Sequence, residues 1–129
     1  KVVSACQGAL KDPSAAVRGA ALQILADIIN HRKDLRVNIV QILPLLDDPT
    51  ESVRGKTMGL LVPMIDDAEH RRKMLASAPR LVDLLRLHQP GSHDLAFTVL
   101  SLLSHKNLDH RDYAGWQAWA DKAAAGKAN

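Results

Sequence analysis

The sequence repeats a ten-residue block, which reads LKDPSAAVRG at residues 10–19 and LDDPTESVRG at residues 46–55. The two copies begin 36 residues apart, and the match continues over later apolar positions, where Leu25 corresponds to Leu61. A repeat of this length is typical of proteins that stack small helical units on one another. The block therefore organises the fold.

Each block predicts a turn followed by a helix. An aspartate just before a helix accepts hydrogen bonds from backbone N–H groups that the first helical turn leaves free. A proline is tolerated at the first helical position, where its missing N–H costs nothing. We therefore expect Asp12 and Asp48 to cap the helices that follow, with Pro13 and Pro49 at their first positions.

The remaining sequence predicts further helices and no sheet. Apolar residues after the first block recur at Val17, Ala21, Ile24 and Ile28, the stripe of an amphipathic helix. The expected helices, about seven in number, lie near residues 2–10, 13–30, 34–46, 50–66, 69–87, 92–105 and 110–124. Prolines inside helices kink them, which we expect at Pro44 and Pro63, and Pro79 marks a break in the fifth helix.

The paired blocks, in which Asp-Pro precedes Val-Arg, resemble the HEAT-repeat family. That resemblance implies an all-α fold, a right-handed α-solenoid of antiparallel helix pairs. It places repeats at 1–30, 34–66 and 69–105, and a C-terminal capping helix with a frayed tail at 106–129. The third repeat is degenerate, because Leu95 and Ala96 stand where the Val-Arg pair is expected.

The resemblance also assigns roles to the repeated charges and to the last helix. Asp12, Arg18, Asp48 and Arg54 resemble a ladder of hydrogen bonds and ion pairs between repeats, although a catalytic charge cluster is the alternative. The three aromatic residues of the tail are spaced three apart and share one helix face. We expect them to cap the end of the stack by packing on Leu100 and Leu103, with a partner-binding patch as the alternative; they are Tyr113, Trp116 and Trp119.

Sequence patterns give no cofactor or metal motif. Cys6 is the single cysteine and is expected to be a small buried hydrophobic residue, with a reactive thiol as the alternative. Histidines at 88, 93, 105 and 110 flank two neighbouring loops, so a metal site where the loops converge is weighed against ordinary surface histidines. We expect no cofactor, no metal and no enzymatic activity.

Function is predicted from the resemblance, in which second helices line a concave surface that binds protein segments. The polar positions opposite the core stripe are Gln23, Asp27, Asn30, Lys56, Thr98, Ser101 and His105. We therefore expect a non-catalytic scaffold or adaptor, whose partner is another protein or the rest of a longer chain. The first helix has no polar cap before Val2, so its outer face is also expected to meet more repeats or another protein.

Charge supports one alternative function. The chain has 17 basic and 14 acidic residues, a net charge of +3, and basic runs begin at His31 and His70 in the turns between repeats. These runs are either solvated turns or a basic ridge that contacts nucleic-acid phosphates. Acidic residues are interspersed with the basic ones, so nucleic acid is the less favoured partner. No apolar run is long enough for a membrane span, and we expect a cytoplasmic protein.

Overall fold

The computed structural model describes residues 1–127, and every regular element in that range is helical. The chain divides into two compact units, residues 1–64 and 65–129. The predicted all-α class is confirmed, and helix pairs of this kind fit an α-solenoid. The right hand of the stack and the division into 1–105 and 106–129 stay predictions.

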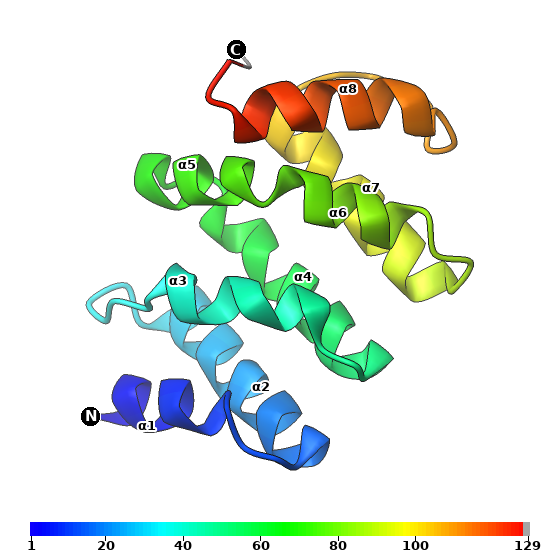
Figure 1. Cartoon of the computed structure of the whole chain (residues 1–129). Helices are drawn as coiled ribbons and strands as arrows, with labels where there is room; N and C mark the ends of the chain where they lie inside the picture. Colours follow the sequence, from blue (N-terminus) through cyan, green and yellow to red (C-terminus); the bar gives the residue numbers. More distant parts are fainter. Residues whose placement is uncertain (128–129) are drawn as a thin grey trace. The chain divides into compact units, whose positions relative to one another are not determined.

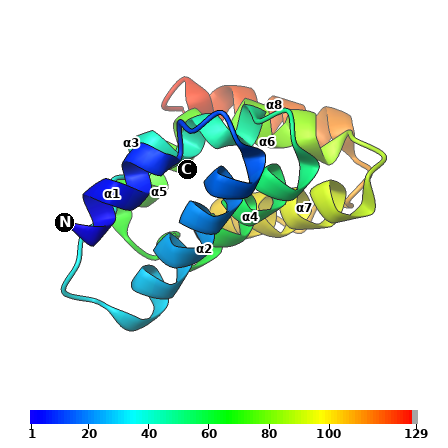
Figure 2. The same ribbon diagram turned by 90° about the horizontal axis from the view of Figure 1, so that it is seen from below.

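The first unit is built from two layers of helices (Figures 1 and 2). One layer holds α1 (Val2–Ala9) and α3 (Ile39–Ile42), and the other holds α2 (Ala15–His31) and α4 (Glu51–Met64). Apolar side chains from α2, α3 and α4, together with Cys6 of α1, are buried in this unit, and burial of their surface stabilises it. Fully buried members of this core are Leu22, Leu25, Ile39, Ile42, Met58 and Leu61.

The helix predicted at 34–46 is shorter and changes type. It begins only at Ile39 and gives way to the 3-10 helix η1 (Leu43–Asp47). Pro44 lacks an N–H and its ring clashes with the carbonyl one turn earlier, so the α-helix stops instead of kinking. Pro63 does remain inside α4, next to its last residue.

The second unit contains α5 (Ala68–Ala76), α6 (Ala78–Leu85), α7 (Pro90–Ser104) and α8 (Tyr113–Ala124). Helix α6 contacts both α7 and α8, and α8 also reaches α5 (Figure 1). The predicted helix at 69–87 is thus two helices, divided at Ser77, with Pro79 in the first turn of the second. This break makes eight α-helices in the described residues, where about seven were expected.

The C-terminal tail, residues 123–129, was expected to fray. This prediction is wrong at Ala123, which is buried near the end of α8, while residues 128–129 lie outside the described residues.

Within residues 1–127, no helix is both long enough and apolar enough to cross a membrane.

Candidate functional site

The two Asp-Pro turns adopt the same local structure. The Asp12 carboxylate accepts a hydrogen bond from the Ser14 N–H at 2.8 Å, and the Asp48 carboxylate accepts one from the Thr50 N–H at 2.9 Å. These bonds close a turn ahead of each helix and do not cap it. The N-cap of α2 is Ser14, whose hydroxyl accepts a hydrogen bond from the Val17 N–H at 3.4 Å, so the prediction that Asp12 caps this helix is wrong. Pro13 and Pro49 accordingly precede helices α2 and α4 and do not open them, which corrects the prediction.

Arg18 joins the two helix pairs of the first unit. Its Nε donates to Asp48 Oδ2 at 2.7 Å and its Nη2 donates to Oδ1 at 3.1 Å, a two-pronged contact between guanidinium and carboxylate. Its Nη1 also donates to the Asp12 carbonyl oxygen at 2.8 Å. Arg54 makes the equivalent bond one repeat later, from Nη1 to the Asp48 carbonyl oxygen at 2.9 Å.

Asp48 is buried, and its environment favours the charged form. Burial by itself raises the pKa of this carboxyl group, since a low dielectric disfavours charge. Hydrogen bonds from Arg18 and Thr50 outweigh burial and hold the pKa of Asp48 below its ordinary value of 3.8. The carboxylate is therefore ionised in the folded protein, and its negative charge is paired with the guanidinium of Arg18.

The predicted partner-binding residues of the first unit share an open surface. Gln23, Asp27 and Asn30 lie along one exposed face of α2. Lys56 is exposed on α4, which lies beside α2, and its Nζ would be 3.2 Å from a methyl group placed on Gly19. Three of the predicted residues thus share one face of α2, and the fourth lies on the neighbouring helix α4; we call Gln23, Asp27, Asn30 and Lys56 the second-helix face.

The other three predicted partner-binding residues lie on α7 in the second unit. Thr98 is exposed, but its hydroxyl donates to the Asp94 carbonyl oxygen at 3.0 Å within the same helix. Ser101 is half-buried. His105 follows the last residue of the helix in the left-handed conformation, with φ of 56°, and is exposed.

Helix α8 lies mainly against α6 and α5, and the packing of its aromatic residues on Leu100 and Leu103 of α7 stays a prediction. Trp116 is fully buried, its Nε1 donates to the Asp109 carbonyl oxygen at 3.0 Å, and its ring meets Phe97 of α7 edge-on. Trp119 is also buried, and its Nε1 has no hydrogen-bond partner among the described residues. Tyr113 is half-buried under the guanidinium of Arg86, 5.4 Å from the ring centre.

The structure brings two of the predicted loop histidines together. His93 Nδ1 is 2.7 Å from the Leu85 carbonyl oxygen, so this nitrogen carries the proton. His93 Nε2 is 3.0 Å from His110 Nδ1. In neutral His93 this Nε2 accepts the hydrogen bond, and His110 Nδ1 donates it. No group of three or more metal-ligating side chains occurs within residues 1–127.

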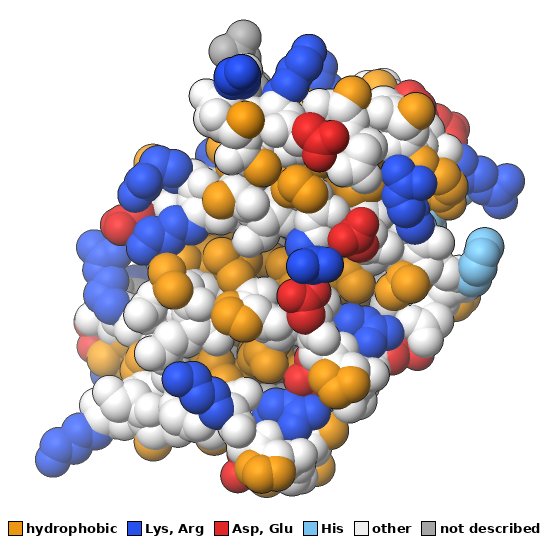
Figure 3. Space-filling model, viewed as in Figure 1, with side chains coloured by type: hydrophobic (Ala, Val, Ile, Leu, Met, Phe, Trp, Pro, Cys, Tyr) orange, Lys and Arg blue, Asp and Glu red, His pale blue; other side chains and the backbone are white. Residues whose placement is uncertain are grey.

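One residue of each basic run donates hydrogen bonds to carbonyl groups at the end of a helix. Lys33 donates to the Ile29 carbonyl oxygen at 2.9 Å at the end of α2, and Arg71 donates to the carbonyl oxygens of Leu102 and Leu103 near the end of α7. Free carbonyl groups at a helix end attract cations. Lys and Arg side chains gather over α5 in Figure 3, but elsewhere on that face they alternate with acidic ones.

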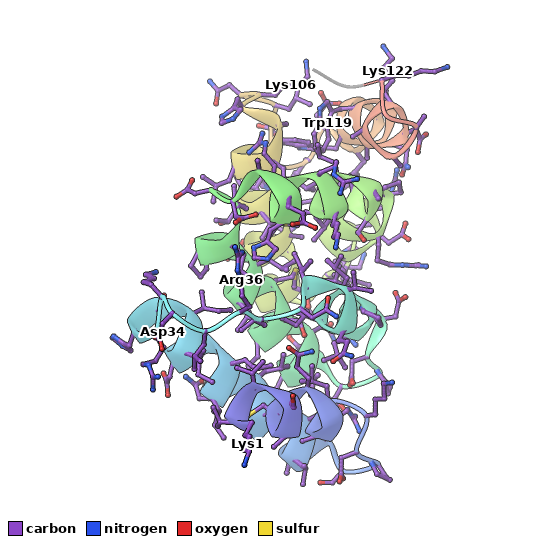
Figure 4. All side chains as sticks on the ribbon, turned by 90° about the vertical axis from the view of Figure 1, so that its left-hand side faces the viewer. Lys1, Asp34, Arg36, Lys106, Trp119 and Lys122 are labelled. Atoms are coloured by element: carbon purple, nitrogen blue, oxygen red, sulfur yellow. The ribbon has the colours of Figure 1, made fainter. Side chains whose placement is uncertain are left out.

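Two small hollows are found in the described surface, one at α1 and one at α8. The first, about 240 Å³, is lined by the polar residues Ser4, Gln7, Lys11 and Gln41 together with Gly8. The second, about 220 Å³, lies at α8 beside Trp119, where Figure 4 shows Lys106 and Lys122 nearby. Both hollows are shallow, and neither holds a nucleophile paired with a base.

Sequence reasoning missed several residues that the structure uses. Gln7 is buried: its side-chain oxygen accepts the Asn38 N–H at 3.0 Å and its amide donates to Gln41. One signal was present, since Gln7 is the polar residue inside the apolar segment that also holds the buried Cys6. Nothing in the sequence signalled that Arg71 would reach across to α7.

The comparison with protein families identifies one segment. Residues 2–32 match the family model of the HEAT repeat. No curated protein and no solved structure shows a significant match to the chain. The matched segment contains α1, the first Asp-Pro turn and α2, which together form the first predicted repeat. The match supports the predicted resemblance, and residues 2–32 of this all-helical chain are similar to a HEAT repeat.

Proposed function

We propose that this chain is a non-catalytic scaffold or adaptor module that binds a protein segment on its second-helix face. HEAT repeats generally mediate protein interactions, and their family is typically non-catalytic. The partner is a separate protein or another part of a longer polypeptide. A cytoplasmic location remains a prediction.

The observation that carries the proposal is the unused polar surface of α2. Gln23, Asp27 and Asn30 are exposed, and none of their side chains makes a hydrogen bond or ion pair with another described residue. Arg18 and Asp48, in contrast, form an ion pair with each other between the two helix pairs. The face therefore offers donors and acceptors, with one acidic and one basic group, to an extended segment of mixed polarity.

The test is an affinity capture with matched variants. The first variant combines Gln23→Ala, Asp27→Ala and Asn30→Ala, which removes polar groups from α2 and raises its helix propensity. The control combines Ser4→Ala, Arg36→Ala and Ser52→Ala, three exposed residues elsewhere in the first unit. Thermal melting of both variants confirms that they remain folded.

The proposal predicts a protein that the unmodified chain and the control retain and that the face variant loses. A loss of affinity of tenfold or more is expected if the three residues include an energetic hot spot, since tenfold corresponds to about 1.4 kcal/mol. A partner retained equally by all three proteins would show that the second-helix face is not where it binds.

A further inference from the structure

The outer side of α2 exposes apolar residues in a regular row. Val17 and Ile24 are 40% and 45% exposed, and the smaller Ala20 between them is also exposed. The spacing of three and four residues puts all three on one side of the helix. We call these three residues the outer α2 row.

The corresponding residues one repeat later are buried. Val53 and Leu60, which follow Val17 and Ile24 by 36 positions, are 0% and 1% exposed. The sequence therefore puts the same kind of residue at both places, but only the copy on α4 has a neighbour that covers it.

That neighbour is α2 itself. Helices α2 and α4 lie against each other, and Lys56, the counterpart of Ala20, approaches Gly19 of α2. Val53, Lys56 and Leu60 thus lie on the side of α4 that faces α2. By the same register, the outer α2 row faces away from α4, where a preceding second helix would fit.

The two repeated aspartates also differ in whether an arginine binds their carboxylates. The Asp48 carboxylate receives the guanidinium of Arg18, while the carboxylate of Asp12, its counterpart, accepts only the Ser14 N–H in the part of the chain that the structure describes. The Asp12 carboxylate is therefore available to a guanidinium that comes from the side which the outer α2 row faces.

We propose that the outer α2 row and Asp12 form a docking surface for a HEAT-type helix pair whose second helix carries an arginine in the place of Arg18. The interface would continue the one seen between α2 and α4. The C-terminal helix pair of a second copy is a poor occupant, because Ala96 stands where that arginine is needed. The surface is distinct from the second-helix face, so either proposal can fail alone.

The test extends the whole chain by a copy of residues 1–36 placed directly before Lys1. This length keeps the repeat in register, so the copied arginine precedes Asp12 by 30 residues, as Arg18 precedes Asp48. The double substitution Val17→Ser with Ile24→Ser is then made at the original positions of both proteins. A double-mutant cycle in the extended chain combines Asp12→Ala at the original position with Arg18→Ala in the copied segment.

In the original chain, where the row is exposed, the double substitution should shift the melting temperature by no more than about 2 °C. In the extended chain it should lower the melting temperature by at least about 6 °C, because the same residues become buried. Asp12→Ala should destabilise the extended chain more when the copied arginine is present than when that arginine is replaced by alanine, because the turn hydrogen bond to Ser14 is lost in both cases. Amide hydrogen exchange should show a protected helix in the added segment.

Three results would overturn the proposal. The added segment could exchange as fast as an unfolded chain, or the double substitution could have the same effect in both proteins. Sedimentation of the original chain could instead reveal a dimer that Val17→Ser with Ile24→Ser dissociates, which would make a second copy the occupant. The affinity capture with the second-helix face variants is independent of each of these results.

Discussion

At the scale of single residues, Asp12 and Asp48 show how one motif acquires two energetic roles. Both carboxylates close the same turn on the residue two positions ahead. Only Asp48 is also bound by a guanidinium, and its side chain is 3% exposed. A buried charge is tolerated when it is paired and hydrogen-bonded, and becomes costly once its partner is removed.

Comparison of Asp48→Ala with Asp12→Ala isolates the ion pair. Asp12→Ala should lower the free energy of unfolding by about 1 kcal/mol, the usual net contribution of one hydrogen bond, here the one that closes the turn on Ser14. Asp48→Ala should lower it by about 3 kcal/mol, because Arg18 is then left largely buried without its counterion. Urea denaturation measures both values, and equal losses would show that the pair contributes nothing beyond the turn.

The lowered pKa of Asp48 predicts an acid dependence of stability. Because this carboxyl group binds a proton less readily when folded than when unfolded, its contribution is complete above about pH 4 and is lost as the pH falls through the folded value. Asp48→Asn should therefore flatten part of the decline in stability below about pH 4. Asp34→Asn, at an exposed pair with Arg32, is the control and should leave the curve nearly unchanged. A curve for Asp48→Asn parallel to that of the unmodified protein would contradict the assignment.

At the scale of helices, the sequence predicted elements well wherever a periodic apolar stripe met a turn signal. Helix α2 ends at His31 as expected near residue 30, and α7 ends at Ser104. Proline effects were harder to predict, because the same residue ends a helix at Pro44, opens one at Pro79 and is accommodated at Pro63. Which outcome occurs depends on tertiary contacts that local sequence does not encode.

The candidate site was predicted only where it depends on local register. Exposure of Gln23, Asp27 and Asn30 followed from helix periodicity, because the core stripe defines the opposite face. The His93–His110 pair and the bonds of Arg71 join residues 17 to 32 positions apart. Such contacts depend on how helices cross and on side-chain rotamers, which no spacing rule supplies.

The two tryptophans of α8 should respond differently to the same substitution. Trp116→Phe removes a hydrogen bond to the Asp109 carbonyl oxygen as well as ring volume. Trp119→Phe removes ring volume together with a buried N–H that has no partner in the described part of the chain, and such a group costs about 1–3 kcal/mol. Thermal melting should therefore show the larger loss for Trp116→Phe. A larger loss for Trp119→Phe would indicate that its N–H is bonded.

At the scale of the whole molecule, the net charge of +3 is a small excess of 17 basic over 14 acidic residues, and several of the basic groups have internal partners. Lys33 and Arg71 bond helix carbonyl groups, and Lys73 lies 3.5 Å from Glu69. Acidic residues lie among the remaining cations, and affinity for DNA falls with salt in proportion to the number of phosphates neutralised.

Binding to duplex DNA should accordingly be weak at low salt and absent by about 200 mM salt. Fluorescence anisotropy with a labelled duplex across a salt series measures this directly. The exposed residue Arg72 offers a variant, Arg72→Ala, that should reduce whatever binding occurs at low salt. A tight complex that survives about 200 mM salt would favour the nucleic-acid alternative over the scaffold.

Site-specific photo-cross-linking tests the central claim, that the second-helix face binds protein, most directly. A benzoylphenylalanine is placed at Gln23 on α2, and at Ser52 on α4 as an exposed control outside the face. After irradiation in the native source, the account predicts a discrete protein adduct from position 23 that is missing from position 52. Adducts of equal yield from both positions, or an adduct from position 23 that nuclease removes and protease does not, would contradict it.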